Sequence, residues 1–159
     1  MKASSSGALE AAGISRTRNS AVRLGALAGR WKVQGDVAAT EHGTALRWTS
    51  EEAAEWLPGE CFLVLRWDAR VGDRDFDGMA VFGCDAHEGY FATFYDNAGH
   101  HPTYLITIDD CTWTLTGEEQ RATYEFAADG ESIRIRWETK GKEGWQPLCD
   151  LRAERAKAH

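Results

Sequence analysis

The stretch Gly29–Val37, which reads GRWKVQGDV, constrains the fold of this chain more than any other. Trp31, Val33 and Val37 alternate with charged or polar residues, and a period of two predicts a strand with one buried and one wet face. Gly35 lies on the tryptophan face, where a glycine weakens a strand unless a sharp bend is needed. Closing a sheet into a small barrel needs such bends. We therefore expect the first strand of a closed barrel, with Trp31 filling its bottom.

The rest of the chain repeats short apolar runs separated by turn signals. The expected strands are residues 30–37, 44–50, 61–69, 79–84, 90–96, 103–108, 111–116, 121–127, 132–139 and 145–155. Residues 51–56 fit a helix or an extended segment, and residues 21–28 form a short helix whose Leu24 and Leu27 share one face. Regular spacing with short connections predicts an all-β fold, a closed antiparallel up-and-down barrel of about ten strands with a short N-terminal helix capping one end.

Length and charge limit the organisation and the partners. The chain has 159 residues, which suits one domain, and we expect a disordered tail at 1–19 followed by the barrel domain at 20–159. The formal net charge is -7 with no long basic run, so neither nucleic acid nor a membrane is an expected partner. Four widely spaced cysteines without a signal peptide predict free thiols and a cytoplasmic location.

The up-and-down order also sorts the connections between the two ends of the barrel. Turns at Pro58, His87, Asp109 and Asp129 fall at the end that carries the helix, and they are mostly tight. The loops that contain His42, Asp75 and His100 fall at the opposite end. We therefore expect the helix end to be closed and the opposite end to be the mouth of the barrel.

Two short motifs resemble a known group of proteins. The pattern L-x-G-x-W-x-x-x-G from Leu27 to Gly35 resembles the opening of lipocalin-like (calycin) barrels, which include the nitrobindin family. The segment from Gly78 to Asp96 looks like bacterial lipocalin-like domains of unknown function. The resemblance implies a barrel that holds a small molecule. Nitrobindin-like proteins bind haem through a histidine on the last strand, but residues 147–153 contain none, and Cys149 is better interpreted as a core residue. We expect no cofactor.

The histidines and aspartates of the mouth do not predict a metal site. His42, His100 and His101 gather there with acidic residues of the 73–77 loop. Adjacent histidines on an extended chain point in opposite directions, so His100 and His101 do not readily share one ion. The aspartate-rich loop 73–78 lacks the closing glutamate and the flanking helices of a calcium loop. We therefore interpret this region as a solvated polar rim.

The aromatic residues of the middle strands are the main pointer to function. A barrel of this many strands is wider than side chains alone can fill, and an aromatic cavity suits a flat or apolar ligand. We expect a small hydrophobic molecule as partner, and the sequence leaves a homodimer open. The predicted ligand-binding residues are Trp48, Arg66, Trp67, Phe94, Tyr95, Tyr104 and His101. Arg66 would meet a ligand carboxylate or pair outside the barrel with Asp68 or Asp96; both interpretations stay open.

An enzyme on the same barrel is the alternative. No nucleophile elbow, phosphate loop, dinucleotide fingerprint or zinc-protease motif occurs in the chain. An isomerase or cyclase of a hydrophobic substrate would take its acid and base from Tyr95, Tyr104, Asp96 or His101. A titratable group buried in the cavity would favour the enzyme, whereas a cavity of apolar groups and hydroxyls would favour simple binding. A haem protein is the third and least favoured interpretation.

Overall fold

The computed structural model describes residues 21–39, 43–85 and 89–157. One short 3-10 helix, η1 (Val22–Leu27), precedes ten antiparallel strands. The strands are β1 (Gly29–Val37), β2 (Leu46–Trp56), β3 (Phe62–Val71), β4 (Arg74–Cys84), β5 (Tyr90–Asp96), β6 (Thr103–Asp109), β7 (Thr112–Thr116), β8 (Gln120–Phe126), β9 (Ser132–Gly141) and β10 (Gly144–Arg155).

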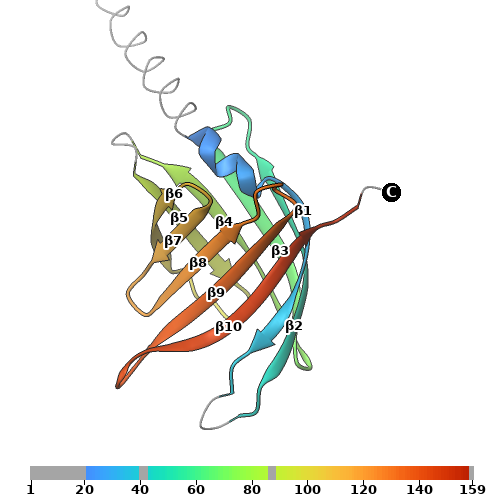
Figure 1. Ribbon diagram of the computed structural model, residues 1–159, viewed down its shortest axis with the longest axis vertical. Coiled ribbons are helices and arrows are strands. Elements are labelled where there is room, and N and C mark those ends of the chain that lie inside the picture. The colour runs from blue at the N-terminus through green and yellow to red at the C-terminus, as the bar shows by residue number, and fades with distance from the viewer. Residues whose placement is uncertain (1–20, 40–42, 86–88, 158–159) are drawn as a thin grey trace, which may run out of the picture.

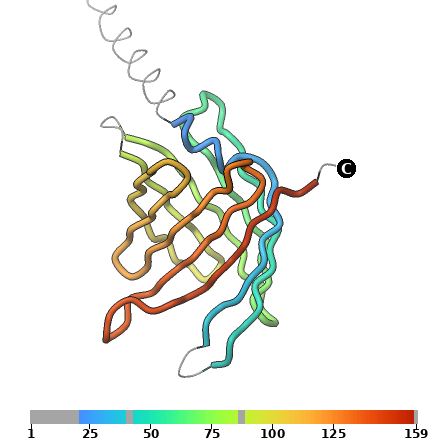
Figure 2. Tube along the Cα trace, viewed as in Figure 1, coloured from blue at the N-terminus to red at the C-terminus, as the bar shows by residue number. Residues whose placement is uncertain are grey.

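Each strand pairs with its neighbours in sequence, and β1 pairs with both β2 and β10, so the sheet closes on itself. The predicted all-β, closed up-and-down barrel is confirmed. Closure leaves no unpaired sheet edge, which removes a template for aggregation. Figures 1 and 2 show η1 lying across one end of the barrel, while the long β1–β2 and β9–β10 pairs extend toward the other. The loop histidines His42 and His87, and the tail 1–19, lie outside the described residues.

The two segments on which the sequence was ambiguous or wrong are both explained by packing. Residues 51–56 are extended, because β2 continues through Trp56 and pairs with β1 on one side and β3 on the other. The N-terminal helix is only a 3-10 turn of six residues, shorter and tighter than the expected segment 21–28. Its Leu24 and Leu27 are nonetheless buried, as the sequence predicted. Packing onto the barrel end, rather than helix propensity, holds so short a helix.

Trp31 seals the barrel at the η1 end. Its side chain is 2% exposed, and its indole Nε1 donates a 2.8 Å hydrogen bond to the Leu27 carbonyl. The guanidinium of Arg155 lies 4.3 Å from the centre of the Trp31 ring and donates hydrogen bonds to the carbonyls of Ala28 and Gly130. These contacts tie the first and last strands to η1, which covers this side of the barrel end.

Gly35 lies where the backbone of β10 passes very close to β1. A side-chain carbon at Gly35 would collide with the backbone of Asp150 and Leu151 on β10. Just before this point β10 carries an irregularity in its pairing with β9, between Pro147 and Cys149. The missing side chain at Gly35 and the irregularity together let β10 cross close over β1, as expected for a small closed barrel.

Candidate functional site

A network of aromatic rings fills the barrel interior. Phe94 is at its centre and contacts four other rings, with centroid separations between 5.3 and 6.0 Å. These four rings belong to Trp67, Phe82, Tyr104 and Trp137. Most contacts are tilted or edge-to-face, the arrangements that aromatic quadrupoles favour. The strands β3 to β9 therefore present a nearly continuous aromatic wall to the inside of the barrel.

The interior is not equally filled along its length. The middle layer is buried, but Trp48, Phe76, Phe94 and Trp137 are only half-buried although their rings belong to the packed interior. An inward-facing ring that keeps accessible surface borders unfilled space. We call these four rings, with the interior surface between them, the aromatic basin. The basin lies toward the end opposite η1, whereas Trp31 is buried at the η1 end.

Glu52 of β2 places a carboxyl group inside this apolar surrounding. It lies on the inward face of β2 with Trp48 and Ser50. Its partner on the neighbouring strand β3 is Trp67. The Trp48 indole Nε1 donates to Ser50 Oγ at 3.0 Å, and Ser50 Oγ donates to Glu52 Oε2 at 2.7 Å. Burial raises the pKa of Glu52 to about 7, and the Ser50 hydrogen bond only partly opposes the rise. Glu52 therefore exchanges a proton near neutral pH.

Two polar atoms beside this chain border accessible space. Glu52 Oε1 and the Tyr124 hydroxyl accept or donate no hydrogen bond within the described residues, yet the only fully enclosed side-chain atom there without a partner is Trp67 Nε1. The first two atoms therefore keep a small accessible surface, on a tyrosine that is itself only 4% exposed. Burial, followed by the nearby Glu52 charge, raises the pKa of Tyr124 well above its ordinary value. The basin thus holds one carboxyl and one neutral hydroxyl with free hydrogen-bonding capacity.

Among the described residues, the indole N–H of Trp67 is the fully buried side-chain group without a hydrogen-bond partner. Trp67 is 7% exposed, and its ring packs against Gly78, where any side chain would collide with it. A buried donor without an acceptor costs about 1–3 kcal/mol. An unpaired buried donor in a native protein needs an explanation, and a bound water or ligand that accepts its hydrogen bond is one.

Cys149 lines the same interior as a neutral thiol. It faces inward on β10 opposite Val37 and Trp137, and it is half-buried. Burial raises the pKa of the Cys149 thiol to about 12, so the thiolate that would bind haem iron is disfavoured. Within the described residues no group of three or more histidine, cysteine or acidic side chains is arranged to hold a metal ion.

Asp96 and His100 form a polar pair at the mouth. His100 Nδ1 lies 3.0 Å from Asp96 Oδ2, and Asp96 also accepts hydrogen bonds from the backbone N–H groups of Ala98 and His100. Burial opposes ionisation of Asp96, but these hydrogen bonds outweigh it and hold its pKa below the ordinary value. Asp96 is therefore a fixed negative charge at neutral pH.

The seven predicted ligand-binding residues divide into two groups. Four of them belong to the interior: Trp48, Trp67, Phe94 and Tyr104. Phe94 contacts both Trp67 and Tyr104, and Phe76 lies between Trp48 and Trp67 and contacts both. The other three are Arg66, Tyr95 and His101, which are exposed, the first two on the outer faces of β3 and β5. An interior site therefore includes the first group only. Strand alternation explains the division, because successive side chains of a strand face opposite sides of the sheet. Arg66 is next to the inward Trp67, and Tyr95 is next to the inward Phe94, so both point outward.

Sequence reasoning missed Glu52 and Tyr124. Residues 51–56 were compatible with either a helix or a strand, so the face of Glu52 was not assigned. Had the alternation of Trp48 and Ser50 been continued by two residues, it would have placed Glu52 inside. An acidic residue at an inward position of a barrel strand was the available signal.

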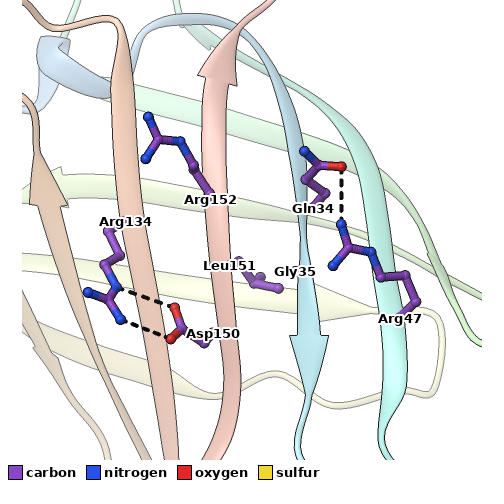
Figure 3. Close-up of a pocket in the computed structure, with 7 residues that line it drawn as sticks. All are labelled: Gln34, Gly35, Arg47, Arg134, Asp150, Leu151 and Arg152. Atoms are coloured by element: carbon purple, nitrogen blue, oxygen red, sulfur yellow. Dashed lines mark hydrogen bonds and ion pairs between the residues drawn. The ribbon is translucent and has the colours of Figure 1, made fainter.

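A second hollow lies on the outer wall of the barrel, over Gly35 (Figure 3). This outer groove measures about 360 Å³ and is lined largely by polar side chains of β1, β2, β9 and β10. Its arginines are already paired: Arg47 with Asp36, Arg134 with Asp150, and Arg152 with Glu154. Exposed pairs of this kind contribute little and leave no free charge for an anion. The groove is therefore a weaker candidate than the interior.

Comparisons with known proteins bear on the fold. No protein-family model and no curated protein matches this chain. Its structure is similar to Rv2717c from M. tuberculosis, with a TM-score of 0.65 at 13% identity over 87% of this chain and 98% of that one. It is also similar to the S-type phycobiliprotein lyase CPES from Guillardia theta, with a TM-score of 0.50 at 10% identity over 90% and 98% of the two chains. A designed fluorescence-activating β-barrel matches at a TM-score of 0.45, 10% identity, and 82% and 94% coverage.

These neighbours fit a lipocalin-like barrel. At identities this low the likeness concerns the fold alone, and the resemblance to the nitrobindin family stays a prediction. In the described part of the chain, no helix has the length and apolar character needed to cross a membrane.

Proposed function

We propose that this protein binds a small, flat, largely apolar molecule in the aromatic basin of its barrel. The observation that carries the proposal is the set of half-buried rings that face inward at the end opposite η1. Rings that stay partly accessible inside a closed barrel offer a contact surface to a planar molecule. The free polar atoms of Glu52 and Tyr124 would fix the orientation of that molecule.

The arrangement of the two ends supports this proposal. Trp31 and Arg155 hold the β1–β10 side of the η1 end with hydrogen bonds and a ring contact, which favours entry from the opposite end. The solved barrel from Guillardia theta is named as a lyase of phycobiliproteins. At 10% identity the comparison shows the fold only, so the proposal rests on the interior of this chain.

A pair of neighbouring aromatic residues gives the test. Phe94 faces the basin, whereas Tyr95 is 47% exposed on the outer wall of β5. The neutral dye Nile red, whose emission rises in an apolar site, serves as the probe. We expect Phe94→Leu to weaken binding by about three- to tenfold, the value of an aromatic contact. Tyr95→Leu, the matched control, should leave the affinity unchanged.

Circular dichroism and thermal unfolding of both variants show that the barrel remains folded. Absence of dye binding to the wild-type protein would contradict the proposal. So would an equal loss of affinity in the two variants, because the dye would then sit on the outer wall.

A second candidate function is catalysis on the same ligand. The pKa of about 7 for Glu52 suits a general acid or base, and the neutral Tyr124 hydroxyl lies in its electrostatic reach. An isomerase that moves a proton between two carbons would need such a pair. Mass spectrometry of a ligand retained from the native host, after incubation in D₂O, would show deuterium on carbon if this is correct. The Glu52→Gln variant should then abolish incorporation without abolishing binding.

A further inference from the structure

The inward positions of the described strands hold two acidic residues and two arginines, and only Glu52 lies deep in the interior without an opposite charge beside it. Glu52 and Asp96 face inward, and among the described residues no lysine, arginine or histidine forms an ion pair with Glu52. Two arginines occupy inward positions, both at strand ends: Arg74 is exposed at the mouth, and Arg155 is held on backbone carbonyls at the η1 end. A carboxylate enclosed without a cation is costly and tends to stay protonated, so a cation from outside that pairs with Glu52 would stabilise its ionised form.

The groups around Glu52 match one class of ligand. The rings of Trp48 and Phe76 lie 5.5 Å apart, and Trp67, which pairs with Glu52 across β2 and β3, contacts Phe76 at 6.1 Å. Ring faces attract cations, and quaternary ammonium groups are bound by aromatic cages. A carboxylate beside such rings adds a direct countercharge.

We propose that the ligand of the basin is an organic cation, a flat or compact apolar body carrying a protonated or quaternary nitrogen that pairs with Glu52 Oε1. This inference rests on the proposed function and specifies its ligand class. The Tyr124 hydroxyl can donate to an acceptor on the same molecule. Ser50 keeps Glu52 Oε2 occupied, which leaves Oε1 for the cation.

Other titratable groups near the site do not share the behaviour of Glu52. Burial keeps the hydroxyls of Tyr104 and Tyr124 and the thiol of Cys149 neutral, with the pKa of Tyr104 and Cys149 raised to about 12. At the mouth, Asp96 stays ionised beside His100, and His101 is exposed nearby. The residues paired with Glu52 on the neighbouring strands β1 and β3 are Trp31 and Trp67, neither of which titrates. Comparing Glu52→Gln with the wild type separates Glu52 from the mouth histidines.

The experiment compares two probes of equal shape. Phenyltrimethylammonium is a cation and tert-butylbenzene is its neutral isostere, and each competes with bound Nile red. We expect the cation to bind more tightly to the wild type, and Glu52→Gln to weaken the cation by at least about tenfold while leaving the neutral probe unchanged. Glu51→Gln is the matched control, because Glu51 is exposed on the outer face of β2. Cation affinity should rise as Glu52 ionises with increasing pH, and neutral-probe affinity should stay flat.

Each result decides the matter. A preference for the cation that Glu52→Gln removes and Glu51→Gln retains supports the inference. Equal displacement by both probes, or a cation preference that survives Glu52→Gln, overturns the inference and leaves the proposed function standing, since Nile red is still bound. Failure of both probes to displace bound Nile red overturns the inference alone, and no binding of Nile red to the wild type overturns both.

Discussion

Replacing Glu52 with glutamine should stabilise the protein at neutral and alkaline pH. Burial raises the pKa of Glu52 from 4.5 to about 7, so the folded state holds its proton more tightly than the unfolded state. Below pH 4.5 the carboxyl is protonated in both states and costs nothing; above pH 7 it is ionised in both states, and the folded state bears the whole penalty of a buried charge. The free energy of unfolding should therefore fall as the pH rises between these values.

The shift corresponds to an upper limit of about 3 kcal/mol, and the accessible Oε1 atom reduces it to about 1–3 kcal/mol. Glutamine keeps the shape of the side chain and still accepts from Ser50, but it does not ionise. Urea denaturation of both proteins across the pH range isolates Glu52, because Asp96 and the other carboxyl groups are common to both. Glu51→Gln on the outer face should differ from the wild type by less than about 0.5 kcal/mol throughout.

The reasoning would be refuted by a difference between Glu52→Gln and the wild type that does not change with pH. A variant less stable than the wild type above about pH 8 would also refute it, because Glu52 would then be stabilising as an anion. That outcome would place a cation of the protein beside Glu52.

The other predictions concern packing and reactivity. Trp31→Ala should cost about 3–5 kcal/mol in urea denaturation because it empties the sealed end of the barrel, and a loss below about 1 kcal/mol would contradict the seal. Gly78→Ala should cost about 1–3 kcal/mol, since the new methyl group meets the Trp67 ring and a backbone carbonyl; an unchanged stability would show that the ring is free to move. A thiol reagent near neutral pH should modify exposed Cys111 at least about a hundredfold faster than Cys149, and equal rates would show that Cys149 is not buried.

The architecture could be predicted because barrel strands have clear local sequence patterns, namely alternating apolar and polar residues bounded by turn residues. Alternation in Gly29–Val37 identified the buried face of the first strand, and turn signals at regular spacing indicated the strand number. The short helix was predicted in place but not in type. Its two leucines define a buried face in either helical form, and only the packing against the barrel end selects the 3-10 geometry.

Which of the predicted residues face the barrel interior could be foreseen only in part, and the reason lies in the local sequence. Trp48, Trp67, Phe94 and Tyr104 are large rings in clear strands, so their contribution to the interior could be expected. When both faces of a strand are apolar, its sequence does not show which face points inward. This is the case for β3 and β5, and it is why Arg66 and Tyr95 were assigned to the site. The position of Glu52 depends on how far β2 extends, which pairing with β1 and β3 decides rather than local propensity.

The most direct test of a ligand site inside the barrel uses the indole N–H signals of the seven tryptophans. They are resolved in a ¹H–¹⁵N spectrum and can be followed while Nile red is added. Trp48, Trp67 and Trp137 border the interior, whereas Trp145 lies on the outer wall beneath the guanidinium of Arg121, 4.4 Å away. We predict shifts of the first three signals at constant Trp145. A shift of Trp145 with the three interior signals unchanged would contradict the interior site.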